Sequence, residues 1–188
     1  MEFHRKSIRL KEYDYAQPGG YFITIVTMRR EFVFGEIVGE EMHLSGLGLM
    51  AEECWRKIPA HFPNVELGAF IIMPNHVHGI VIITENDRAE AFASTRRGTI
   101  YRAPTLTIEQ FGKPTIGSLP TIIRIYKAAV TRRAGRELNA ANIWQRNYYE
   151  HVIRNDADWD RIHRYIETNP SMWAEDEENP AIPRKVHL

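Results

Sequence analysis

The chain has 188 residues, 44% of them hydrophobic and 26% charged, with a formal net charge of zero. This is the composition of a globular domain, and no apolar run reaches the roughly 18 residues of a membrane span. A single cysteine, Cys54, excludes an internal disulfide framework and favours a cytoplasmic protein. We interpret Cys54 as a buried packing residue on a helix rather than as a reactive thiol.

The charges are unevenly distributed along the chain. Residues 96–154 contain eleven Lys and Arg against three Asp and Glu, whereas residues 1–95 and 155–188 are each net acidic. A basic middle segment in a neutral chain indicates either a localised surface for a polyanion or an ordinary solvated face. Charge alone leaves both interpretations open.

The first expected elements are a strand, a hairpin and a helix. A β-branched and aromatic run at 20–28 predicts a central strand. Short strands at 35–38 and 42–44 predict a hairpin. Ser45 is expected to cap a helix that runs to about Ile58. The expected buried stripe of this helix is Leu47, Met50, Cys54 and Ile58.

Two long strands and a second helix follow. Residues 65–73 and 76–84 are β-branched runs joined by a tight turn, which predicts an antiparallel pair. Residues 85–117 are irregular and are expected to form a long loop or insertion. Ser118 is then expected to cap a helix to about Ala134. Its expected apolar stripe is Leu119, Ile122, Ile123, Tyr126 and Val130.

The remaining elements complete an α+β pattern. A fourth strand is predicted at 147–153, and a last helix, capped at 155–156, runs through Asn169. Interleaved helices and tightly joined neighbouring strands indicate a ferredoxin-like antiparallel sheet with helices packed on it. We expect one domain over residues 1–173, followed by an acidic, proline-containing and loosely ordered tail at 174–188.

Two histidines open the strand at 76–84. Residues i and i+2 of a strand point to the same side, so His76 and His78 should aim both imidazoles in one direction. Two neighbouring imidazoles on a rigid element form half of a site for a divalent metal. A His-x-His pair in a strand is also often purely structural, and the pair alone does not exclude that interpretation.

The last helix carries a second pair of interest. Tyr165 and Asn169 are four residues apart and therefore share a helical face. A tyrosine hydroxyl can attack phosphorus and form a covalent intermediate, and an asparagine oxygen can bind Mg²⁺ or Mn²⁺. By themselves the two residues could equally be a core tyrosine and a helix terminator. Tyr148 and Tyr149 are competing nucleophiles by residue type, and we interpret them as packing or base-stacking residues.

Five short blocks occur in a fixed order along the chain. They are GYFIT at 20–24, MPNHVHG at 73–79, GSLPTIIR at 117–124, IWQRNYYEHVIR at 143–154 and RYIETNP at 164–170. Over about residues 13–173 the sequence resembles the HUH transposases with a single catalytic tyrosine, and most closely the REP-associated tyrosine transposases.

The resemblance implies a complete set of roles. His76, His78 and Asn169 would bind Mg²⁺ or Mn²⁺, and Tyr165, on the last helix, would be the catalytic nucleophile. The implied enzyme is a metal-dependent single-stranded DNA endonuclease and strand transferase. It would nick DNA at palindromic, hairpin-associated sites, such as repetitive extragenic palindromes, through a 5′-phosphotyrosine intermediate. Whether it acts as a monomer or a homodimer, and whether it is mobile or domesticated, stays open.

Nine basic residues are candidate contacts to DNA phosphates. They are Arg96, Arg97 and Arg102 in the loop, Arg124, Lys127, Arg132 and Arg133 on the helix after Ser118, and Arg146 and Arg154 beside the fourth strand. Two alternative functions remain. One is a protein that binds palindromic DNA without cleaving it, and the other is a ferredoxin-like RNA-binding domain without a metal.

Overall fold

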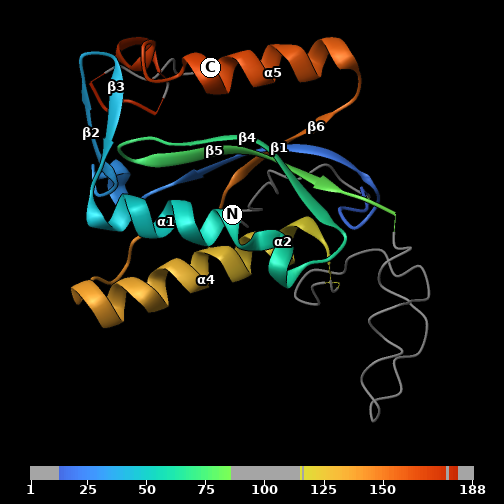
Figure 1. The fold of residues 1–188 in the computed structure, drawn as a ribbon, viewed down its shortest axis with the longest axis horizontal. Helices are drawn as coiled ribbons and strands as arrows, with labels where there is room; N and C mark the ends of the chain where they lie inside the picture. Colours follow the sequence, from blue (N-terminus) through green and yellow to red (C-terminus); the bar gives the residue numbers. More distant parts are fainter. Residues whose placement is uncertain (1–12, 86–114, 116, 177, 182–188) are drawn as a thin grey trace, which may run out of the picture.

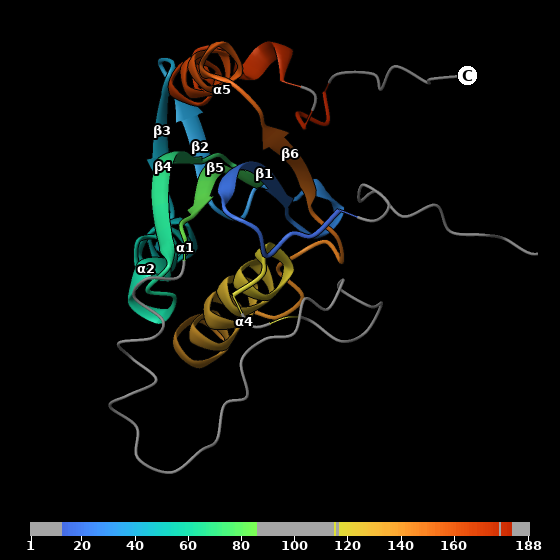
Figure 2. The same cartoon turned by 90° about the vertical axis from the view of Figure 1, so that its right-hand side faces the viewer.

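A computed structural model describes residues 13–85, 115, 117–176 and 178–181. Its centre is a four-stranded antiparallel sheet in the order β4-β5-β1-β6. In Figures 1 and 2 the helices α1, α2 and α4 cover one face of this sheet and α5 covers the other. The predicted α+β class is therefore confirmed, and the strand order is that of a βαββαβ core.

The elements have the following bounds. The sheet consists of β1 (Gly19–Val26), β4 (Val65–Ile72), β5 (His76–Ile83) and β6 (Tyr149–Ile153), and a separate hairpin consists of β2 (Gly35–Val38) and β3 (Glu41–Leu44). The helices are α1 (Gly46–Arg56), α2 (Ile58–His61), α4 (Leu119–Leu138) and α5 (Asp156–Thr168), with short 3₁₀ turns η1 (Met28–Arg30) and η2 (Trp173–Glu175). Among these described helices, none combines the length and the apolar character that a membrane span requires.

Two helices differ from the expectation. The first ends at Arg56, and α2 begins separately at Ile58 with a proline in its first turn, where the missing N–H costs no hydrogen bond. The stripe of the first helix is buried at Leu47, Met50 and Ile58, but Cys54 is only half-buried. Burial raises the pKa of the Cys54 thiol, which disfavours the reactive thiolate.

The helix α4 is four residues longer than predicted. It continues past Ala134 to Leu138 and ends at Asn139, which adopts the left-handed conformation that commonly stops a helix. Its predicted apolar stripe is buried throughout. The last turn, residues 135–138, is exposed throughout and adds no buried position to the stripe, so the buried stripe alone underestimates the length of this helix.

Alternation along β5 separates its side chains between two cores. Val77 and Val81 belong to the main core under α1 and α4, whereas Ile80 packs with Ile162 and Ile166 of α5. Because side chains two apart share a face, the histidines of β5 lie on the α5 side, with Ile80. The strand thus delivers both imidazoles to the layer that also contains the last helix.

Gly79 is closely packed on the opposite face of β5. A Cβ at this position would lie 2.3 Å from Cζ2 of the fully buried Trp55 and 3.0 Å from Cβ of Phe70. Gly79→Ala should therefore lower the free energy of unfolding by about 1–3 kcal/mol through overpacking, measured by urea denaturation. Gly46→Ala is the matched control, because a Cβ at that position would have no atom within 4 Å and stability should hold. Equal stability of both variants would contradict this packing.

Candidate metal and nucleophile site

The two histidines lie side by side at the start of β5. His76 is 0% exposed and His78 is 3% exposed, and their ring centroids are 4.3 Å apart. In the sheet, His76 lies opposite Val26 and His78 lies opposite Thr24 of β1. The predicted common direction of the two imidazoles is therefore confirmed.

Asn75 orients the ring of His76. The Nδ2 of Asn75 donates to the carbonyl oxygens of Arg30 at 3.3 Å and Glu178 at 2.8 Å. Its Oδ1 is thereby left to accept the N–H of His76 Nδ1 at 2.9 Å. This tautomer places the lone pair of His76 on Nε2, a buried atom with no hydrogen-bond partner among the described residues. An imidazole held in this way through Nδ1 is arranged as a metal ligand.

His78 connects the strand to the last helix. Its Nδ1 lies 2.9 Å from Oγ1 of Thr24, and its Nε2 lies 3.1 Å from the hydroxyl of Tyr165. Tyr165 is 41% exposed, and its ring packs edge-on against Phe22 and His78. The hydroxyl of Tyr165 therefore reaches the histidine pair while the side chain stays accessible to a large substrate.

Asn169 closes the site one turn after Tyr165. It is the C-cap of α5 and is 1% exposed. Its Nδ2 donates to Oδ2 of Asp176 at 2.8 Å, whereas its Oδ1 is buried and has no hydrogen-bond partner in the part of the chain that the structure describes. The structure thus brings together His76, His78, Tyr165 and Asn169, the four residues that the sequence singles out.

Asp176 is a fifth member of the site that sequence reasoning missed. It is 6% exposed, and its Oδ2 lies 3.3 Å from the hydroxyl of Tyr165 and 4.0 Å from Nε2 of His78. One ligand atom each of His76, His78 and Asp176 lies within 4.8 Å of the others. No spacing motif marks Asp176, because it is one acidic residue in an acidic tail.

The described part of the tail, residues 174–176 and 178–181, differs from the expectation of loose order. The turn η2 follows α5 closely, and both Asp176 and Asn179 are buried. Hydrogen bonds from Glu178 to Asp176 and from Asn179 to Trp173 order this segment internally, and the one from Asn75 to the carbonyl oxygen of Glu178 attaches it to the turn before β5. Residues 182–188 lie outside the described residues.

The electrostatics of the group favour a cation. Burial lowers the pKa of His76 well below its usual value, and the neighbouring His78 lowers it further. Burial alone would raise the pKa of Asp176, but contacts with His78, His76, Asn169 and the N–H of Glu178 hold that pKa below its usual range. At neutral pH the site therefore contains an uncharged imidazole at His76 and an ionised carboxylate at Asp176.

The competing tyrosines lie elsewhere. Tyr148 is 8% exposed and belongs to the main core. Tyr149 is 46% exposed and lies opposite Thr24 in the sheet, which puts it on the same face as His78 but on β6. Tyr165 is the tyrosine whose hydroxyl is hydrogen-bonded to His78.

The basic residues of α4 lie on the sheet face opposite to Tyr165 (Figure 1). Arg124 and Arg132 are exposed there. The ammonium of Lys127 donates to three backbone carbonyls of residues 145–147, and burial lowers the pKa of Lys127 to about 8. Arg133 pairs with Glu53 and Glu137. The structure does not bring this helix to the histidine pair.

The other five basic residues predicted to contact DNA lie either beside β6 or outside the described residues. Arg146 and Arg154 are exposed just before and just after β6. Arg96, Arg97 and Arg102 lie outside the described residues.

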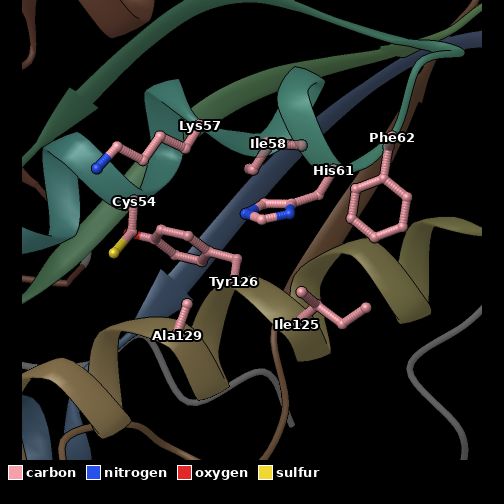
Figure 3. A pocket seen from close by; sticks show the side chains of 8 residues that line it. All are labelled: Cys54, Lys57, Ile58, His61, Phe62, Ile125, Tyr126 and Ala129. Atoms are coloured by element: carbon pink, nitrogen blue, oxygen red, sulfur yellow. The ribbon is translucent and has the colours of Figure 1, made fainter.

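A small apolar pocket lies between α1, α2 and α4 (Figure 3). Its walls include Phe62, Ile125 and Tyr126, with Cys54 at one side. The pocket is on the sheet face away from the histidines. The described residues that line it do not point several polar groups at one place. We assign it no role in the chemistry.

Comparisons with known proteins find relatives in sequence and in structure. No protein-family model matches the chain. It is 41% identical over 174 residues to an uncharacterised Haemophilus influenzae protein, covering 93% of this chain and 92% of that protein. It is 28% identical over 158 residues to a Haemophilus influenzae protein named as a REP-associated tyrosine transposase, covering 84% and 73% of the two chains.

A solved structure shares the fold. It is the structure of a REP-associated tyrosine transposase bound to a REP hairpin, with a TM-score of 0.57 and 21% sequence identity. The similarity covers 89% of this chain and 74% of that one. The sheet and helices described above are therefore those of this transposase fold.

Proposed function

The chain belongs to the family of REP-associated tyrosine transposases, and from this membership we propose that its DNA-processing role is to nick and rejoin single strands beside palindromic hairpins. The observation that carries the proposal is the accessible Tyr165, whose hydroxyl lies 3.1 Å from Nε2 of a buried histidine pair. A nucleophile at a potential metal site is the arrangement that phosphodiester cleavage needs.

The residues of the site fit a divalent cation. Nε2 of His76 and Oδ1 of Asn169 are both buried and lack hydrogen-bond partners within the described residues, although such atoms normally have one. With Nε2 of His78 they form the proposed ligand set for Mg²⁺ or Mn²⁺. When bound, the cation would polarise a phosphate oxygen and so favour attack on phosphorus.

Tyr165 makes and breaks the covalent bond to DNA in this proposal. Its hydroxyl oxygen attacks a phosphate in line, loses its proton and forms a phosphotyrosine ester with the 5′ end. The bond from phosphorus to the 3′ oxygen breaks, and that oxygen takes up a proton as a free 3′-hydroxyl. A 3′-hydroxyl that attacks the ester reverses the step, joins two strands and restores the tyrosine.

The DNA contacts extend the proposal over the α5 face. Tyr149 is exposed on this face and is proposed to stack on an unpaired base, with Arg146 and Arg154 on the adjoining phosphates. Arg124 and Arg132 would meet DNA that continues around the molecule to the face of α4. Lys127 and Arg133 are already engaged within the fold and would contribute less to binding.

A covalent trapping assay tests the function. The full chain is incubated with Mn²⁺ and labelled hairpins that carry randomised single-stranded flanks, and the products are separated under denaturing conditions. We expect a protein–DNA adduct with Mn²⁺ and none when EDTA is present in excess. Hairpins without flanks are the control and should give no adduct. DNA binding without any adduct would instead support the non-cleaving palindrome-binding alternative.

A further inference from the structure

We propose that Asp176 is a ligand of the divalent cation, supplied to the histidine pair by the segment that follows α5. The inference rests on the proposed function only in placing a divalent cation at His76 and His78. It adds a charged oxygen ligand that the motif-based set of His76, His78 and Asn169 does not contain.

The carboxylate of Asp176 is positioned and oriented toward the histidine pair. Its Oδ2 lies 2.8 Å from Nδ2 of Asn169 and 4.0 Å from Nε2 of His78. Its other oxygen, Oδ1, accepts the backbone N–H of Glu178 at 2.7 Å, which fixes the direction of the carboxylate. The carboxylate therefore belongs to a group of three ligand atoms, one each from His76, His78 and Asp176, that lie within 4.8 Å of one another.

Charge gives a second reason for a cation at Asp176. The side chain is 6% exposed, and among the described residues no Lys or Arg forms an ion pair with it. A buried carboxylate without a compensating cation is costly. Two imidazoles and one amide are also an uncharged set, whereas Mg²⁺ and Mn²⁺ prefer anionic oxygen ligands. A cation between these groups satisfies both requirements.

The segment that carries Asp176 is anchored to the site. The Nδ2 of Asn75, whose Oδ1 orients His76, donates to the carbonyl oxygen of Glu178. The carboxylate of Glu178 lies 2.6 Å from the guanidinium of Arg30 in a largely buried ion pair. The ring of Trp173 packs 6.0 Å from the ring of His76. The same residues thus position a histidine ligand and the loop that carries Asp176.

The geometry has a consequence for Tyr165. Its hydroxyl is hydrogen-bonded to Nε2 of His78 and to Oδ2 of Asp176, which are two of the proposed ligand atoms. A cation on these atoms competes with the hydroxyl for them. Tyr165→Phe should therefore bind Mn²⁺ at least as tightly as the wild type.

The test is a titration of Mn²⁺ into the full chain without DNA, with free Mn²⁺ counted by electron paramagnetic resonance. Asp176→Asn keeps the shape of the side chain and should lower Mn²⁺ affinity by more than about tenfold. Glu175→Gln is the matched control: it removes one charge from an exposed neighbour and should leave affinity unchanged. Asp176→Glu, which keeps a carboxylate, should bind with an affinity between those of the wild type and Asp176→Asn.

The outcomes separate the two proposals. Unchanged Mn²⁺ affinity in Asp176→Asn, or no Mn²⁺ binding by the wild type, would overturn the inference. Metal-free thermal melting of each variant establishes that a loss of affinity is not a loss of the fold. If Mn²⁺ binding depends on Asp176 but the trapping assay gives no adduct, the inference stands and the nickase function fails. If adducts form and Asp176→Asn binds Mn²⁺ normally, the inference alone fails.

Discussion

Replacing Tyr165 by phenylalanine should abolish the covalent protein–DNA adduct and lower strand cleavage by more than about a thousandfold, because no other group takes over a deleted nucleophile. Affinity for hairpin DNA should change by less than about threefold, since binding depends mainly on contacts to phosphates and bases. The measurements are adduct formation on a denaturing gel and DNA binding by fluorescence anisotropy at fixed salt.

Tyr149→Phe is the matched control for Tyr165→Phe. Both tyrosines are exposed, at 46% and 41%, and both lie on the face of the sheet that α5 covers. Phenylalanine keeps a stacking ring at position 149, so cleavage should continue. An adduct that persists in Tyr165→Phe would contradict the assignment and would point to Tyr148 or Tyr149.

Removing His76 should have the second largest effect. Its Nε2 is buried and has no hydrogen-bond partner among the described residues, while Asn75 holds the ring through Nδ1, so His76→Ala deletes a proposed ligand. We expect Mn²⁺-dependent cleavage to fall by more than about a hundredfold, because orienting the phosphate and polarising it are lost together. The measurement is the initial rate of cleavage over a series of Mn²⁺ concentrations.

His151→Ala is the control for His76→Ala. His151 is also on the α5 face, but it is exposed, and its Nε2 is hydrogen-bonded to Asp158 rather than to a residue of the site. Its replacement should leave the Mn²⁺ dependence unchanged. Full activity of His76→Ala at limiting Mn²⁺ would contradict the proposed role of the histidine pair.

Local patterns explain why much of this site was predictable. The period of two in β5 fixes His76 and His78 on one face, and the spacing of four in α5 fixes Tyr165 beside Asn169. The family resemblance drawn from five blocks is confirmed by the comparisons. Each of these features depends either on residues close together in the chain or on a short motif. Both kinds of feature can be read directly from a sequence.

The sequence was a poorer guide to how distant segments pack against one another. β5 is buried on both faces, so its own pattern does not reveal which helix covers the histidines. Lys127 has the spacing of a basic outer face, yet its ammonium turns back to backbone carbonyls of the segment before β6. Asp176 reaches the site because the turn η2 directs the tail back toward the histidines, and no sequence motif marks its position. These positions are set by packing between distant segments, which composition does not encode.

Locating the covalently bound DNA on the protein would identify the nucleophile itself. The adduct formed with Mn²⁺ is digested with nuclease and trypsin, and the remaining nucleotide is placed by tandem mass spectrometry. Cleavage after Arg146, Arg154 and Arg164 separates the candidate tyrosines into the peptides 147–154 and 165–184. We predict a nucleotide 5′-phosphate on Tyr165 in the second peptide. A nucleotide on the peptide 147–154 would contradict the assignment of Tyr165 as the nucleophile.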